Sequence, residues 1–352
     1  MRHAILTGIE LPDYGEPVSE PALGRTLFEA RLARLRERMQ LHGFSALVIY
    51  GDREHVANLA WATGHDPRFE EALLLVLPGR LPVLFAGNEG YPYAEAAQGL
   101  FERQLWQPLS LMGQPRDKLR PLATLLREAG LAPGMRIGLA GWKGFETDDG
   151  VFDPGWFETP HYLVETLRGF GEVSNAALLF MHPQDGLRSV NEADQIACFE
   201  YAASKTSNAL RRFIRGVRPG MSEFEACRNM ALDGSMQSVH VNMSSGSRAP
   251  LGLCSPSSRI INKGDPIVVG HGLMGALAHA PGIASSPTLI EMSSSPDFGP
   301  KLSVADLRFV KMQSDRCGLS KPMASWPFSS ANGTSFPSAA WRHCFFDGIF
   351  TT

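Results

Sequence analysis

The segment SSGSRAPLGLCSPSSRIINKGDPIVVGHGLMGALAHAPG, residues 244–282, contains two short apolar runs on either side of a glycine-containing loop. The first run, residues 267–270, follows the turn sequence KGD, and the second covers residues 277–280. The sequence LMG at residues 273–275 separates them. This arrangement favours a β-hairpin that closes at the glycine.

Two helices are predicted before this hairpin, each with a capping box at its start. Ser189 is followed three residues later by Glu192, so that the hydroxyl and the carboxylate each satisfy a free backbone N–H. The PG pair at residues 219–220 ends this first helix, and Ser222 with Glu225 opens the second. Apolar residues at helical spacing give the first helix one buried stripe: Ile196, Phe199, Ala203, Leu210, Phe213 and Val217.

The first half of the chain alternates predicted helices and strands, which indicates an α/β layer. A basic amphipathic helix comes first. The predicted strands are residues 46–50, 73–77, 81–85 and 135–140, and the predicted later helices are residues 117–131 and 161–170.

Five motifs then occur in order: LRSVNEADQI (187–196), RPGMSEFEA (218–226), SSG (244–246), SPSSR (255–259) and NKGDPIVV (262–269). Together they resemble the opening half of the pita-bread domain shared by creatinase, prolidase and aminopeptidase P. The segment FEARLARLRERMQLHGFSALVIYGDREHVANLAWATGH (28–65) is similar to the start of the domain that precedes the catalytic domain in creatinase and aminopeptidase P. The resemblance implies an α/β fold class, with a creatinase-type N-terminal α/β domain followed by a partial pita-bread α+β domain.

Three regions are expected. Residues 1–185 form the N-terminal domain, residues 186–284 form the first half of a pita-bread domain, and the boundary lies near Pro183 and Gly186. Residues 285–352 are serine-rich and lack clear periodicity, so we expect an atypical, poorly ordered segment. A truncation or frameshift accounts for it most economically, and a natural extension is the alternative.

The composition narrows the function classes. A net charge of −3 without a basic run gives no reason to expect a nucleic-acid partner. The first residues lack a long apolar core, so neither a signal peptide nor a membrane span is expected. The five cysteines are widely spaced and form no C-x-x-C motif, which indicates reduced thiols and a cytoplasmic location.

The metal ligands implied by the resemblance are missing. Metal-dependent members use two aspartates on the hairpin, a downstream histidine and two late glutamates to hold two manganese, cobalt or zinc ions that activate water. The aspartate positions fall on Gly270 and Pro281, which have no metal-binding side chain. After residue 225 the chain has one glutamate, Glu291, where the family needs two. We therefore expect neither the dinuclear centre nor a metal cofactor.

A metal-free site would need other groups. The histidine that shuttles protons in creatinase corresponds to Leu253, so His240 would have to substitute for it. Cys254 is a candidate nucleophile, although no histidine stands at a spacing that identifies its partner. Arg248 is a candidate for binding a substrate carboxylate. For each residue a structural or solvated role is the alternative.

His271 and His279 form a second candidate. A hairpin that turned about Gly275 would bring them face to face, close enough to share a metal or a proton. The family register instead pairs Gly270 with Pro281 and turns His271 to the opposite face, which would leave two ordinary histidines.

Two function classes remain open. The first class is a hydrolase of the creatinase and Xaa-Pro peptidase type that is either inactive or metal-independent. The second class is a non-catalytic homologue that binds a small ligand or a partner, or a damaged gene product. The resemblance implies small peptides or guanidino compounds as substrates. It also implies a homodimer in which the N-terminal domain of one subunit covers the cleft of the other.

Overall fold

The computed structural model describes residues 7–8, 13–284 and 301–302, which form two compact units. The N-terminal unit is Ala22–Gln195, and the C-terminal unit combines the described residues before Ala22 with those from Ile196 onward. The expected boundary at residues 185–186 stays a prediction. The expectation for residues 285–352 lies outside the described residues, apart from 301–302. None of the described helices combines the length and apolar character that crossing a membrane requires.

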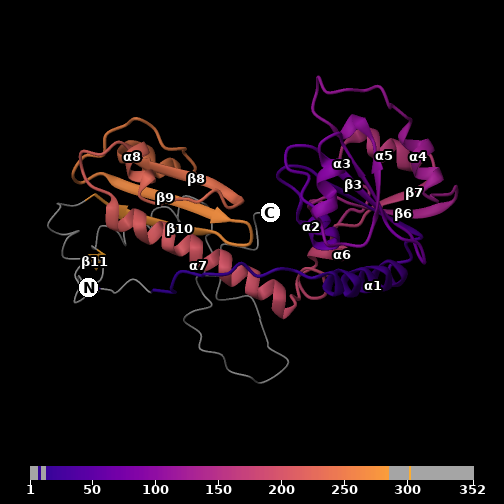
Figure 1. Cartoon of the computed structure of the whole chain (residues 1–352), viewed down its shortest axis with the longest axis horizontal. Coiled ribbons are helices and arrows are strands. Elements are labelled where there is room, and N and C mark those ends of the chain that lie inside the picture. The colour runs from indigo at the N-terminus through magenta and orange to yellow at the C-terminus, as the bar shows by residue number, and fades with distance from the viewer. Residues whose placement is uncertain (1–6, 9–12, 285–300, 303–352) are drawn as a thin grey trace. The chain divides into compact units, whose positions relative to one another are not determined.

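The N-terminal unit is built on a six-stranded sheet with strand order β5-β4-β3-β2-β6-β7 (Figure 1). The antiparallel neighbours are β2 with β3 and β3 with β4, and the other three pairs are parallel. The four strands expected from the sequence are confirmed, and β5 and β7 are additions at the two edges. The strands are β2 (Ala46–Gly51), β3 (Ala72–Val76), β4 (Val83–Ala86), β5 (Glu102–Leu105), β6 (Met135–Ala140) and β7 (Gly171–Asn175).

Helices cover both faces of this sheet. Leu47 and Ile49 of β2 pack into the core of one face, and Ala46 and Val48 pack into the core of the other. Because both faces are buried, β2 is apolar throughout rather than alternating. One face carries α1 (Arg25–Leu41), α2 (Ala57–Thr63) and α6 (Leu178–Met181); the other carries α4 (Leu122–Glu128) and α5 (His161–Arg168). The short helices α3 (Gly90–Tyr93) and η1 (Ala94–Ala96) follow β4, and η2 (Gln107–Leu109) follows β5.

The C-terminal unit contains a three-stranded antiparallel sheet with order β10-β9-β8 (Figure 1). Its core joins the sheet to α7 and α8 through Phe213, Ala226, Met243, Ile267 and Val269. The elements are α7 (Ala193–Gly216), α8 (Glu223–Arg228), β8 (Gln237–Ser245), η3 (Gly246–Leu251), β9 (Pro266–Leu273) and β10 (Ala278–Ile283), with β1 (Thr7–Gly8) paired to β11 (Lys301–Leu302). The predicted hairpin is confirmed, as is the capping box of Ser222 and Glu225.

The capping box predicted at Ser189 and Glu192 is wrong. The helix begins at Ala193, and the Ser189 hydroxyl instead donates to the His182 carbonyl at 2.7 Å. The Glu192 carboxylate accepts from Arg31 Nη2 at 2.7 Å. Since the Arg31 side chain is fully buried, its guanidinium needs this counter-charge, and the long-range ion pair takes the place of the local cap.

Candidate functional site

The β9–β10 hairpin places the two expected ligand positions on one face. Gly270 pairs with His279, and Pro281 pairs with Val268, so the expected direct pairing of Gly270 with Pro281 is wrong by two residues. Directly paired residues share a face, and side chains alternate along each strand. Both positions therefore belong to the same face of the sheet, as the family register requires.

On β8, Asn242 pairs with Gly270 and Ser244 pairs with Val268. A Cβ added at Gly270 would meet the His279 ring at 3.5 Å, an ordinary van der Waals distance, so the position has room for a side chain. Space around the Cβ position therefore does not dictate glycine here. We call this surface the Gly270 face: Asn242, Ser244, Val268, Gly270, His279 and Pro281.

The Gly270 face does not fit a dinuclear metal centre. Such a centre requires several carboxylate oxygens and nitrogen ligands around two ions. This face offers one histidine, one amide, one hydroxyl and no carboxylate. Elsewhere in the described part of the chain, no three His, Cys, Asp or Glu side chains are close enough together to hold a metal ion. Glu291 lies outside the described residues.

The structure does not bring His271 and His279 together. His271 pairs with Ala278 on the opposite face of the sheet and is fully buried. Burial lowers its pKa, and the Val239 backbone offsets only part of that effect. Neither ring nitrogen makes a well-formed hydrogen bond within the described residues. His279 is exposed on the Gly270 face. His271 is thus a core residue of the unit.

Arg248 lies in a buried network centred on Glu223, a residue that the sequence did not single out. Arg248 Nη1 donates to Glu223 Oε2 and, at 2.7 Å, to Ser257 Oγ. Ser245 donates its backbone N–H and its hydroxyl to Glu223 Oε1, both at 2.8 Å. Ser257 donates the same two groups to Oε2, at 2.9 and 2.6 Å. The guanidinium of Arg248 is therefore committed to a structural ion pair.

The electrostatics of this network keep Glu223 ionised. Burial acts to raise the pKa of its carboxyl, but the hydrogen bonds from Ser257 and Ser245 and the charge of Arg248 together outweigh it, so the pKa is lowered. The only signal in the sequence was an acidic residue in the first turn of a helix, which is usually explained by the helix dipole. Nothing local indicates that this carboxylate is fully buried.

His240 and Cys254 are not joined into a catalytic pair. His240 is exposed on β8, and Cys254 is half-buried in the segment after η3. The backbone of Cys254 accepts a hydrogen bond from Met243 N at 2.8 Å, which ties this segment to β8. No hydrogen bond connects the Cys254 thiol to a histidine among the described residues.

Comparison with known proteins identifies the fold. Residues 31–148 match the family described as the Creatinase/Prolidase N-terminal domain. No curated protein matches the chain by sequence. The resemblance to the creatinase, prolidase and aminopeptidase P family is confirmed by this match together with the solved structures.

Three of the similar solved structures are peptidases. The prolidase of Pyrococcus horikoshii OT3 is 15% identical with a TM-score of 0.53, over 73% of this chain and 66% of that chain. The Xaa-Pro dipeptidase of Bacillus anthracis is 16% identical with a TM-score of 0.50, over 75% and 68%. The His361Ala form of Escherichia coli aminopeptidase P is 14% identical with a TM-score of 0.50, over 78% and 66%. At such identities the likeness shows the fold, and the chain spans just under two thirds of the Pyrococcus prolidase.

Proposed function

We propose that this chain is a homologue of the creatinase and Xaa-Pro peptidase type of C–N hydrolase that has lost the dinuclear metal chemistry and is inactive or metal-independent. The Gly270 face carries this proposal. Gly270 and Pro281 stand on one face of the hairpin, where the resemblance requires two carboxylates, and the neighbouring Asn242 and His279 do not replace them. A metal-activated water has no adequate ligand set there.

Within this proposal we favour a non-catalytic role in binding a small ligand or a partner, because the candidate catalytic side chains lie apart from one another. Hydrolysis of an amide without metal needs a base within hydrogen-bond reach of a nucleophile or a water. His271 is buried on the core face while His279 lies on the other, and Arg248 is held by Glu223. Among the described residues, these groups supply no such pair.

We propose small peptides, or guanidino compounds, as the ligand class. The peptides are supported by the names of the similar structures, a prolidase, an Xaa-Pro dipeptidase and an aminopeptidase P. The guanidino compounds follow from the resemblance to creatinase. A homodimer and a cytoplasmic location complete the proposal. The location is supported by the wide spacing of the five cysteines, which form no C-x-x-C motif, and light scattering of the purified chain tests the dimer.

The decisive experiment incubates the purified full-length chain with Xaa-Pro dipeptides and with creatine, each with and without added manganese. Bound metal is measured by elemental mass spectrometry on the same samples, and Pyrococcus horikoshii prolidase, assayed with the dipeptides in parallel, validates the conditions. We expect no manganese-dependent turnover and no stoichiometric metal. Turnover that rises with bound manganese would overturn the proposal. Turnover without metal would leave the metal-independent form and exclude the non-catalytic one.

A further inference from the structure

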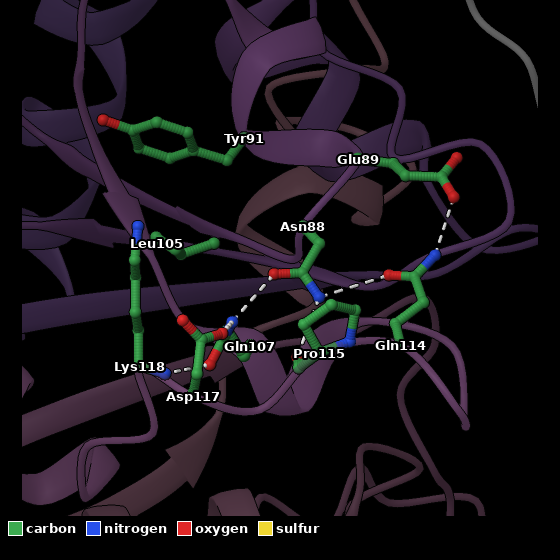
Figure 2. Close-up of a pocket in the computed structure, with 9 residues that line it drawn as sticks. All are labelled: Asn88, Glu89, Tyr91, Leu105, Gln107, Gln114, Pro115, Asp117 and Lys118. Carbon is green, nitrogen blue, oxygen red and sulfur yellow. Dashed lines mark hydrogen bonds between the residues drawn. The ribbon is translucent and has the colours of Figure 1, made fainter.

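A recess of about 550 Å³ opens in the N-terminal unit at the carboxyl ends of β4 and β5 (Figure 2). These two strands are parallel, so the segments that follow them leave the sheet at the same edge. We call this site the amide recess; the residues drawn in Figure 2 line it.

A buried glutamine fixes one side of the amide recess. Gln107 is 2% exposed, and its Nε2 donates to Asn88 Oδ1 at 3.2 Å and to Asp117 Oδ1 at 3.1 Å. Its Oε1 accepts from the backbone N–H of Lys118 at 2.7 Å. One buried amide therefore positions the Asp117 carboxylate and the backbone of Lys118 before any ligand arrives.

The other side is held in the same way. Asn88 Nδ2 donates to the Pro115 carbonyl at 3.0 Å and to Gln114 Oε1 at 3.3 Å, and Gln114 Nε2 donates to Glu89 Oε1 at 2.6 Å. The Arg116 guanidinium donates to the carbonyls of residues 110, 111, 114 and 115. The segment that closes the recess is thus tied down by side chains rather than left as a free loop.

The recess contains charged groups of both signs that can still form hydrogen bonds or ion pairs with a ligand. Among the described residues, the Lys118 ammonium makes no ion pair or side-chain hydrogen bond, although its charge acts on neighbouring Asp117; Figure 2 draws its side chain among the residues that line the recess. Asp117 and Glu89 each accept a side-chain hydrogen bond at one oxygen only. The hydrogen bond from Gln107 lowers the pKa of Asp117, so this carboxylate is ionised at neutral pH.

We propose that the amide recess binds a small zwitterion of the α-amino acid class. A simple anion would be attracted by Lys118 but repelled by Asp117 and Glu89. A simple cation would be attracted by the two carboxylates but repelled by Lys118. A molecule with a carboxylate and an ammonium a few bonds apart satisfies both signs. The site belongs to the N-terminal unit, and it does not depend on the function proposed for the Gly270 face.

The test titrates the full-length chain with glycine and follows binding by ligand-observed NMR, with acetate and methylammonium as singly charged comparisons. We expect saturable binding of glycine and weaker binding of both comparisons. Lys118→Met and Asp117→Asn each weaken glycine binding by about two- to five-fold, the range for one solvent-exposed charge contact. The matched controls Lys263→Met and Asp148→Asn change exposed charges outside the recess and leave binding unchanged.

Thermal unfolding of each variant confirms that the fold is intact, so a lost signal reports the site. The proposal is overturned if glycine shows no saturable binding, or if acetate binds as tightly as glycine. It is also overturned if the recess variants bind glycine as well as the two control variants do.

Discussion

Replacement of Glu223 by glutamine tests whether the buried network holds the C-terminal unit together. The carboxylate is fully buried and accepts four hydrogen bonds from Ser245 and Ser257, besides its ion pair with Arg248. Glutamine keeps the shape of the side chain. The amide nitrogen of the glutamine, however, would face N–H and O–H groups that are themselves hydrogen-bond donors. The Arg248 guanidinium would also lose its counter-charge.

The magnitude follows from these contacts. Removing one partner of a buried ion pair costs about 3–5 kcal/mol, and an unsatisfied buried N–H costs about 1–3 kcal/mol. The serine hydroxyls rotate and recover part of the loss, so we expect Glu223→Gln to lower the free energy of unfolding by about 4 kcal/mol. That is a large fraction of the roughly 5–15 kcal/mol that stabilises an ordinary domain.

Hydrogen exchange measured by mass spectrometry provides the assay. The protection factors of peptides that cover β8 and residues 255–259 should fall by about 10²–10³-fold, since each 1.4 kcal/mol of lost stability is a factor of ten. Glu225→Gln is the matched control, because it makes the same change two residues away on the exposed side of α8. The reasoning is refuted if Glu223→Gln loses no more protection than Glu225→Gln.

A double-mutant cycle then apportions the effect. Arg248→Met alone leaves the buried carboxylate without its cation, whereas Glu223→Gln with Arg248→Met removes both charges. We expect the double variant to be more stable than the sum of the single losses predicts. Strict additivity would mean that the ion pair contributes nothing beyond the serine hydrogen bonds.

Three further outcomes are expected. Burial lowers the pKa of His65 to about 4, so protonation favours the unfolded chain as the pH falls below 6.5. The N-terminal unit keeps its full stability above pH 6.5 and loses about 3 kcal/mol as the pH falls to 4. Urea unfolding of His65→Leu should show a flatter pH dependence of the free energy of unfolding in that window. Glu192→Gln leaves the fully buried Arg31 without its counter-charge and should cost about 3 kcal/mol in the same unfolding assay. A cost near zero would mean that this ion pair does not stabilise the unit. Gly270→Asp should fold normally, because a Cβ there meets only an ordinary contact, and elemental analysis should find no stoichiometric manganese in it, since one carboxylate does not complete the ligand set.

The elements that the sequence predicted are those with local signals. β2 and β6 are continuous apolar runs, the β9–β10 hairpin has a glycine turn, and Ser222 caps α8 through its neighbour three residues on. β5 and β7 were missed because ERQL and GEVSN contain few apolar residues. Each lies at an edge of the sheet and is fixed by pairing with a strand far away in the sequence.

The sites were less predictable because their partners are distant. Glu223 joins residues more than twenty positions away, and Gln107 in η2 binds Asp117 and the Lys118 backbone 10 and 11 residues further along the chain. No periodicity records such contacts. The expected register of the hairpin was wrong by two residues, yet the faces were right, because a shift by two preserves the alternation of side chains.

The two faces of β9 separate the packing of the hairpin from the residues of the Gly270 face. Ile267 and Val269 belong to the core with Phe213 and Met243, whereas Gly270 and Pro281 belong to the other face. Carboxylates gathered on that face would repel one another whenever no cation was bound, so they contribute to catalysis at a cost to stability. Glycine and proline remove that repulsion and take nothing from the core. The hairpin is specified by its core face and its turn, so the residue types on the Gly270 face can differ without loss of this architecture.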